Sequence, residues 1–211
     1  MSDEVHHPIF ARVYERLARS AEGRGGAEHR RSLLEGCRGR VIEVGAGSGA
    51  NFAHYPTGVT EVVAVEPEAR LRERACAAAE HAPVPVSVRD GVAGSLGCDT
   101  ASFDVGIASL MLCTVPDQPA ALAELFRVIR PGGELRFYEH VRSSRSAEQR
   151  VQRFADATFW PRVAGGCHLS RDTRAGIERA GFQLERCERF AFSPAPYLPP
   201  APHILGSARR P

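Results

Sequence analysis

The sequence predicts an α/β fold, in which a mostly parallel sheet is covered by helices on both faces. Two observations carry this prediction. Five strand-like segments alternate with helix-like segments between residues 40 and 140, and a parallel sheet with crossover helices accommodates that order. Two further strand-like segments near the carboxyl end have no helix between them, so we expect them to form an antiparallel hairpin.

Local patterns place each element in order. An apolar stripe opposite Arg and Glu predicts an amphipathic helix at 7–21, and the glycines at 23–26 separate it from a short helix that reaches residue 34. Apolar runs predict strands at 40–44, 60–65, 84–88, 103–108 and 135–140. Further helices are expected at 48–54, 68–82, 117–129, 147–160 and 170–181, the last with Ser170 as its N-cap. The hairpin strands are expected at 182–190 and 203–208.

Length, charge and the basic residues limit the function. A chain of 211 residues is most simply one domain, and its 43% hydrophobic content is ordinary for a globular protein. A formal net charge of only +2 gives no reason to expect nucleic acid as a partner. All 27 basic residues are Arg, which excludes a Schiff-base lysine, a P-loop lysine and a Tyr-x-x-x-Lys dehydrogenase dyad.

The cysteines and the start of the chain bear on metals and location. The six cysteines show neither C-x-x-C spacing nor paired histidines, so we expect no metal and no disulfide framework. The chain begins without a basic region followed by an apolar one, and no apolar run approaches the length of a membrane span. We therefore expect reduced thiols, no integral membrane segment and a cytoplasmic location. The oligomeric state stays open.

The most informative segment is residues 41–51, Val-Ile-Glu-Val-Gly-Ala-Gly-Ser-Gly-Ala-Asn, where a strand runs into a glycine-rich turn. Glycine permits φ > 0 and lets the main chain approach a ligand closely, and a following helix would point free N–H groups at the site. The pattern also satisfies the dinucleotide motif G-x-G-x-x-G/A, so the glycines alone leave the ligand undecided. The binding residues expected here are Gly45, Ala46, Gly47, Gly49 and Asn51.

Glu43 favours one ligand over the other. A carboxylate inside an apolar strand is costly unless it is paired, and strand alternation places it on the same side as Gly45. The segment E-V-G-x-G-x-G resembles motif I of the class I S-adenosylmethionine (SAM) methyltransferases. The resemblance implies a Rossmann-like, seven-stranded sheet whose last strand lies between the fifth and sixth. It also implies that Glu43 serves the ammonium end of SAM; the alternative is a buried acid that caps a backbone turn.

The ends of the second and third strands carry further candidate residues, because ligands of such sheets bind at the carboxyl ends of strands. Glu66 and Pro67 close the second strand, where a carboxylate suits the vicinal hydroxyls of a ribose. An NAD enzyme would want the same acid, whereas NADP prefers a basic residue. Asp90 and Gly91 resemble the methyltransferase motif whose acid reaches the adenine amino group, or else form a plain Asp-Gly turn.

The end of the fourth strand completes this set of candidate residues. Ser109 and Leu110 follow that strand, where the resemblance places the sulfonium of SAM.

A narrower resemblance runs through most of the chain. It is carried by the segments 42–45, 49–52, 55–56, 112–113, 130–133, 139–141, 166–171, 177–180 and 202–204, with Asp156 and Trp160. The chain resembles bacterial relatives of the mammalian alkyl-thiol methyltransferases, which methylate sulfur on small exogenous thiols. Those mammalian proteins carry a hydrophobic N-terminal membrane anchor, and an amphipathic helix is expected here instead.

His140, at the carboxyl end of the fifth strand, is the best-placed candidate catalytic base. Its alternative is a polar residue that bonds a loop carbonyl, and Glu139 is expected to face the opposite side and orient a loop. A thiol acceptor, with a pKa near 8.5, needs little help from a base. The residues expected to bind the acceptor are Phe10, Tyr14, Cys113, Trp160 and Arg171, although aromatic stripes are also typical of plain core.

These observations predict a SAM-dependent methyltransferase that acts on a small molecule, with a thiol sulfur as the first choice of acceptor. The alternatives are methylation of oxygen, nitrogen or carbon on a phenol, amine, quinol or phospholipid head group, a nicotinamide oxidoreductase, and a SAM-binding protein without activity. We expect a helical cap at 1–36, a cofactor-binding core at 40–140, and acceptor-side helices with the terminal hairpin at 141–211.

Overall fold

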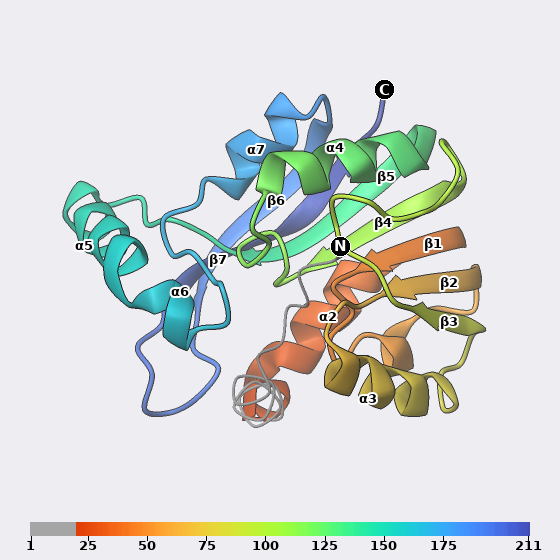
Figure 1. Cartoon of the computed structure of the whole chain (residues 1–211), viewed down its shortest axis with the longest axis horizontal. Coiled ribbons are helices and arrows are strands. Elements are labelled where there is room, and N and C mark those ends of the chain that lie inside the picture. The colour runs from red at the N-terminus through yellow and green to blue at the C-terminus, as the bar shows by residue number, and fades with distance from the viewer. Residues whose placement is uncertain (1–19) are drawn as a thin grey trace.

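The computed structural model describes residues 20–211 and centres on a seven-stranded sheet of order β3-β2-β1-β4-β5-β7-β6 (Figure 1). β1 to β5 are parallel, and β7 runs antiparallel to both of its neighbours. The strands are β1 (Gly39–Val44), β2 (Val59–Val65), β3 (Val86–Arg89), β4 (Phe103–Ser109), β5 (Ile129–His140), β6 (Gln183–Phe192) and β7 (Ala201–Arg209). The predicted sheet, with its last strand between the fifth and sixth, is confirmed.

Helices cover both faces of this sheet. One hydrophobic core packs α4 and α7 against it, and a second core packs α2 and α3 against the other face. Figure 1 shows these two pairs above and below the sheet, with α5 and α6 projecting to the left. The helices are the π-helix η1 (Glu22–Gly26), α2 (Ala27–Leu34), the 3-10 turn η2 (Phe52–His54), α3 (Ala69–Ala79), α4 (Gln118–Val128), α5 (Ser146–Thr158), α6 (Trp160–Val163) and α7 (Thr173–Arg179).

The strand alternation decides which face each candidate residue meets. Val41 lies in the core on the α2 and α3 side, so Glu43, two residues further on, faces that side as well. On β5, Tyr138 lies in the same core, and His140 shares its face. Glu139 therefore faces the α4 and α7 side, as the sequence predicted.

The expected helix at 48–54 is wrong. Turns occupy residues 47–51, and only the short η2 follows them. The φ angles of Gly45, Gly47 and Gly49 are 69°, 58° and 80°, so the backbone repeatedly enters the left-handed region and cannot begin an α-helix there. The turn itself, rather than a helix N-terminus, therefore presents main-chain groups at this edge of the sheet.

Two further differences lie in the last third. The helix expected at 147–160 divides at Phe159, whose φ of −121° is not helical, and Pro161 sits in the first turn of the new helix α6. Asp172 caps α7 by accepting a first-turn N–H at 3.2 Å, so Ser170 is not the N-cap. Ser170 instead donates its hydroxyl to Asp156 at 2.6 Å.

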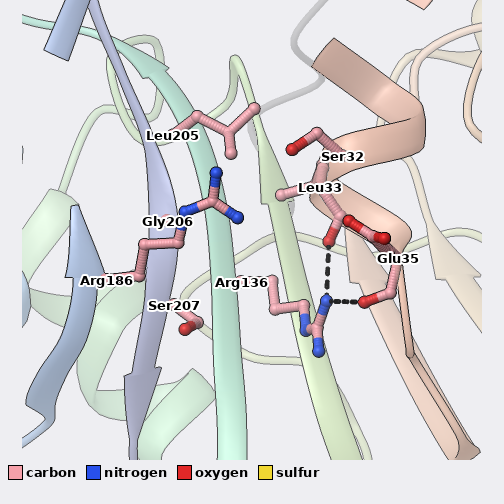
Figure 2. Close-up of a pocket in the computed structure, with 8 residues that line it drawn as sticks. All are labelled: Ser32, Leu33, Glu35, Arg136, Arg186, Leu205, Gly206 and Ser207. Carbon is pink, nitrogen blue, oxygen red and sulfur yellow. Dashed lines mark hydrogen bonds between the residues drawn. The ribbon is translucent and has the colours of Figure 1, made fainter. Parts of the chain in front are cut away.

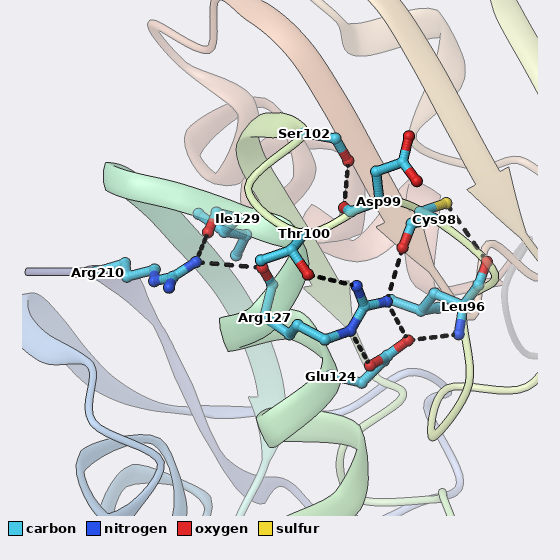
Figure 3. A network of polar contacts seen from close by, with 9 residues as sticks. All are labelled: Leu96, Cys98, Asp99, Thr100, Ser102, Glu124, Arg127, Ile129 and Arg210. Carbon is cyan, nitrogen blue, oxygen red and sulfur yellow. Dashed lines mark hydrogen bonds and ion pairs between the residues drawn. The ribbon is translucent and has the colours of Figure 1, made fainter.

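A polar network at the amino ends of β4 and β5 fixes the loop that precedes β4 (Figure 3). Arg127 pairs with Glu124 at 2.7 Å and donates to the Cys98 carbonyl at 2.7 Å. Arg210, near the carboxyl end of the chain, donates to the Arg127 carbonyl at 3.2 Å. β5 starts at Ile129, directly after α4, rather than at 135 as expected. This network is structural, because it lies at the end of the strands opposite the candidate site.

Part of the sequence prediction falls outside the described residues. The amphipathic helix expected at 7–21 lies almost wholly before residue 20, and so do the candidate acceptor residues Phe10 and Tyr14. Within residues 20–211, no helix has both the length and the apolar character that crossing a bilayer requires.

Candidate functional site

The glycine-rich turn lies against the end of β2. The amides of Gly45 and Ala46 donate to the Val65 carbonyl at 2.8 Å and 3.2 Å, and the Gly47 amide donates to Glu66 Oε2 at 2.8 Å. A Cβ on Gly45 would lie 2.7 Å from Met111 Cβ, closer than real carbon contacts allow. Glycine is therefore required here by both the backbone angles and the packing of the β4 loop.

Glu43 is buried and bonded on both oxygens. Its Oε1 accepts from Asn51 Nδ2 at 2.9 Å and its Oε2 accepts from the Tyr55 hydroxyl at 2.6 Å, with only 1% of the residue exposed. Burial raises its pKa to about 7, against the lowering effect of these two bonds. Both partners of the Glu43 carboxylate are side chains. Glu43 therefore does not cap a backbone turn, which was the alternative role considered from the sequence.

Sequence reasoning missed Arg30, which completes this cluster from α2. The guanidinium donates to Asn51 Oδ1 at 2.9 Å, lies 3.4 Å from Ser109 Oγ, and pairs with Glu22 at 2.7 Å. It is only 6% exposed. No local pattern links residue 30 to residue 51, so the sequence offered no signal for Arg30. Tyr55 was part of the family resemblance but had no role assigned.

Glu66 holds the glycine-rich turn to β2. Besides the Gly47 amide, it accepts the Glu68 amide at 3.0 Å, and the residue is 6% exposed. Burial raises its pKa, partly offset by these backbone bonds. A carboxylate offers about four lone-pair positions, so two bonds leave acceptor capacity for ribose hydroxyls.

Arg72 ties the ends of β2 and β3 together. It donates to the Glu66 and Pro67 carbonyls, each at 2.9 Å, and pairs with Asp90 at 3.1 Å. The Asp90 side chain is 72% exposed. A Cβ on Gly91 would lie 2.9 Å from a Val65 methyl group, so Gly91 allows the loop to pack closely over β2. The fold thus brings the predicted residues of both strand ends to one edge.

The loop after β4 is held from both sides. Leu110 has a φ of 57°, an unusual backbone for a non-glycine residue, and its amide donates to the Tyr138 carbonyl at 2.7 Å. Glu139, wholly buried, accepts the amides of residues 111, 112 and 113 at 2.9–3.0 Å. Burial raises the Glu139 pKa well above its usual range. Its predicted part in orienting a loop is confirmed.

The predicted acceptor residues Cys113, Trp160 and Arg171 meet around this loop. Arg171 donates to the Leu112 carbonyl at 2.7 Å, which anchors its segment to the loop. The Cys113 thiol contacts Cys167, and this contact lowers the pKa of Cys167 while it raises that of Cys113. The indole of Trp160 also lies beside Cys167 and helps to lower the pKa of that thiol.

His140 lies on the opposite face of β5, beside a second histidine that sequence reasoning did not assign. The rings of His140 and His203 stand edge to face with centroids 5.3 Å apart, and both residues are buried. Neither ring nitrogen of His140 has a hydrogen-bond partner within residues 20–211. In this part of the chain His140 therefore does not bond a loop carbonyl, which was the alternative role considered from the sequence. Burial lowers both pKa values to about 4, so both rings are neutral near pH 7.

Aromatic rings surround this histidine pair. His29 of α2 and Tyr138 of β5 are 5.3 Å apart, and Phe190 and Phe192 of β6 lie 5.9 Å and 5.7 Å from His203.

A separate hollow of about 220 Å³ lies between α2 and β7 (Figure 2). Its lining contains none of the predicted site residues, and Arg136 there donates to the Leu33 carbonyl at 3.2 Å. We therefore place the candidate site at the strand ends and not at this hollow.

Comparisons with known proteins identify the family of the chain. Residues 42–137 match the family model described as "Methyltransferase domain". The chain is 35% identical over 182 residues to mouse thiol S-methyltransferase TMT1B, an alignment that covers 83% of this chain and 73% of the relative. The human TMT1B protein is 32% identical, with the same coverage of 83% and 73%.

A solved structure has the same fold. A putative methyltransferase from Bacillus halodurans superposes with a TM-score of 0.73 at 16% identity, over 88% of this chain and 98% of that one. The similarity to the thiol S-methyltransferases spans most of both sequences. The chain therefore belongs to the SAM-dependent methyltransferase family that contains the thiol S-methyltransferases TMT1B.

Proposed function

We propose that this enzyme transfers the methyl group of SAM to the sulfur of a small, mostly apolar thiol. The observation that carries the proposal is the 35% identity to a thiol S-methyltransferase over 83% of the chain, which extends beyond the cofactor-binding core. The acceptor side adds support, because its two histidines are neutral and surrounded by aromatic rings.

The cofactor residues are proposed from their positions at the strand ends. Gly45, Ala46, Gly47, Gly49 and Asn51 would pass beneath the methionine part and ribose, with Glu43 acting on the ammonium end through Asn51. Glu66 and Pro67 would meet the ribose, Asp90 and Gly91 the adenine, and Ser109 and Leu110 the region of the sulfonium. The glycine turn and the remaining acceptor capacity of Glu66 fit this cofactor. Arg30 adds a buried cation, suited to the SAM carboxylate.

The chemistry follows from charge. When bound, SAM supplies a methyl group on a positively charged sulfur; the thiolate forms the new C–S bond as the old one breaks, and the thiol proton goes to solvent. Because this reaction cancels charge, a dry pocket of low polarity favours it. Neutral His140 and His203 would keep such a pocket free of charge, and Glu139, which accepts the Cys113 amide, holds the loop at the end of β4 on the other face of β5. This proposal gives His140 a minor part, since a group whose pKa is about 4 is a weak base.

We also propose the division of labour expected from the sequence: residues 1–36 as a cap, 40–140 as the cofactor core and 141–211 as the acceptor side. In that division Trp160 and Arg171 line the acceptor, together with Phe10 and Tyr14 from the cap. A cytoplasmic location is proposed because all six cysteines are free thiols in the structure, which suits a reducing compartment.

A product-mass screen tests the acceptor. The full chain is incubated with SAM and equal panels of thiols, phenols, amines and quinols, and methylated products are identified by mass. The expected result is methyl thioethers from apolar thiols, with none from the Gly47→Val variant as the cofactor-binding control. Turnover of a phenol, amine or quinol with no thiol turnover would overturn the proposal, as would SAM binding with no product from any panel.

A further inference from the structure

Five of the six exposed large hydrophobic residues in the described part of the chain lie on α5, on α6, at the junction of these two helices, or in the loop between β6 and β7. Val151 and Phe154 are each 68% exposed, Phe159 is 52%, Val163 is 63% and Tyr197 is 77% exposed. Figure 1 shows these three segments on the same side of the molecule, with α5 and α6 standing out from its body. Side chains of this size on a projecting surface indicate that something apolar contacts them.

The pattern on α5 separates an inner from an outer face. Gln152 and Ala155 are buried toward the protein, whereas Val151 and Phe154, three residues apart, form an outward stripe. Arg150 and Arg153 flank that stripe and are exposed, and no carboxylate among residues 20–211 pairs with either of them. The outer surface of α5 is therefore both apolar and basic.

α6 and the β6–β7 loop extend the same combination. Arg162 of α6 is exposed, and its guanidinium donates a hydrogen bond to the Thr158 carbonyl of α5. The two acidic residues of α5 do not offset this charge, because Glu148 pairs with Arg145 and Asp156 points inward to the Leu169 amide at 2.7 Å. We name Val151, Phe154, Phe159, Val163 and Tyr197, with Arg150, Arg153 and Arg162, the α5–α6 face.

We propose that the α5–α6 face docks the enzyme on an anionic lipid bilayer, with the apolar side chains at the acyl boundary and the arginines at the head-group phosphates. A projecting helix with an apolar stripe beside unpaired basic residues has the composition of an interfacial helix. Phenylalanine and tyrosine tips suit that depth, and arginines add attraction to a negatively charged surface. The charge complementarity favours such a bilayer over a second copy of this chain, whose matching face would be equally basic.

Docking by this face would bring the acceptor side to the membrane. Asp156, on the inner side of α5, binds the Leu169 and Ser170 amides at 2.7 Å and 2.8 Å, in the segment that leads to Arg171. Trp160, a proposed acceptor residue, begins α6. An apolar acceptor dissolved in the bilayer would then meet the enzyme at its point of entry, although docking itself does not depend on which atom is methylated.

Vesicle flotation of the full chain tests the proposal. We expect binding to vesicles that contain phosphatidylglycerol, at least ~10-fold weaker binding to pure phosphatidylcholine, and release of the protein at ~1 M salt, where charges are screened within about 3 Å. A Val151→Asp/Phe154→Asp variant should bind at least ~10-fold more weakly, because each apolar side chain is replaced by a carboxylate. Arg150→Gln/Arg153→Gln should weaken binding to the phosphatidylglycerol vesicles and leave the weaker binding to pure phosphatidylcholine unchanged.

Matched controls come from elsewhere on the surface. Val92, the sixth exposed hydrophobic residue at 44%, lies after β3 at the opposite edge of the sheet, so Val92→Asp should leave flotation unchanged. Arg38→Gln/Arg179→Gln removes the same charge from exposed positions off the face. Unchanged thermal midpoints and SAM affinity establish that each variant is folded. The proposal is overturned if the wild type binds neither vesicle, if Val151→Asp/Phe154→Asp binds as the wild type does, or if those substitutions instead abolish a dimer seen by sedimentation.

Discussion

The proposed cofactor side and the proposed acceptor side of this site are built in different ways. Around the glycine turn, the two buried carboxylates are bonded within the chain: Glu43 to Asn51 and Tyr55, and Glu66 to two backbone amides. On the proposed acceptor side, the two buried ring nitrogens of His140 have no partner in residues 20–211. The first region is organised before any ligand arrives, whereas the second has polar groups whose cost of burial a ligand could offset.

The two regions also differ in how burial shifts their titrating groups. Burial raises the pKa of Glu43 from 4.5 to about 7 and lowers those of His140 and His203 from 6.5 to about 4. In each case the neutral form is favoured, because an uncompensated charge is costly away from water. The same physical cause therefore gives opposite dependences of stability on pH in the two halves of the site.

The largest expected effect is the loss of SAM binding when the glycine-rich turn is changed. Gly47→Val should abolish detectable SAM binding, because Gly47 has a φ of 58° that a β-branched residue does not tolerate. Isothermal titration calorimetry measures the loss. The control is Gly36→Val, at a similar φ of 72°, where an added Cβ would have no atom within 4 Å; it should lower stability and leave affinity intact. Equal affinity losses in the two variants would mean that strain, and not the position of the turn, is responsible.

The opposite pH dependences give the next largest effect. The folded state takes up a proton at Glu43 between pH 4.5 and about 7, so this group's contribution to the free energy of unfolding falls as pH rises through that window. The interval corresponds to about 3 kcal/mol at ~1.4 kcal/mol per pH unit. Urea unfolding of Glu43→Gln and wild type at several pH values measures it. The difference, variant minus wild type, should increase with pH, and a flat difference would contradict the raised pKa.

The histidine pair should show the reverse. His140 and His203 remain neutral in the folded state down to about pH 4, whereas the unfolded state takes up protons near 6.5. Stability is then present above pH 6.5 and is lost as pH falls toward 4, by up to about 3 kcal/mol per histidine. His140→Gln/His203→Gln should make this acid limb shallower in the same urea series; His29 and His54, whose pKa values burial also lowers, contribute the remainder. His81→Gln, at an exposed position, is the control and should leave the limb unchanged.

A smaller loss of SAM affinity is expected when Glu66, at the end of β2, is replaced. Glu66→Ala should weaken SAM affinity by ~1.5–3 kcal/mol, the range for hydrogen bonds to a charged group. The loss should appear in cofactor affinity more than in turnover at saturating SAM, because the ribose contact is the same in the ground and transition states. Glu61→Ala removes another β2 carboxylate, far from the turn and paired with Arg40, and serves as control. Normal affinity with a collapsed turnover number would refute the role of Glu66.

The smallest effect is expected for His140 in catalysis. With a thiol acceptor, His140→Ala should reduce the rate at pH 7 by less than ~10-fold and recover as pH rises above the substrate pKa, because the thiolate then forms without a base. The test is the pH–rate profile of both proteins on the best thiol of the screen. A defect of ~100-fold or more at every pH would instead identify His140 as an essential base.

The sequence by itself determined the strand order, the terminal hairpin, the glycine turn and the placement of Glu43, Glu66 and Glu139. The strand segments, the hairpin and the faces of the strand residues follow from local periodicity and side-chain alternation, and the turn follows from the backbone freedom of glycine, all of which operate over a few residues. The order of the strands in the sheet was implied by the family resemblance and not by these local patterns. The same locality explains two errors. Ser170 looks like an N-cap until Asp156 takes its hydroxyl, and residues 48–54 look helical until three positive φ angles are counted.

Only the tertiary structure decided which distant residues meet. Arg30 reaches Asn51 and Ser109 across 21 and 79 residues, and no local pattern encodes such a contact. The neutrality of His140 depends on how much of the protein buries it, and His203 becomes its neighbour because β7 pairs with β5. The exposure of Phe154 likewise depends on which elements leave the outer face of α5 uncovered. Burial and long-range contact are properties of the packed chain, and they turn a recognisable family pattern into a particular site.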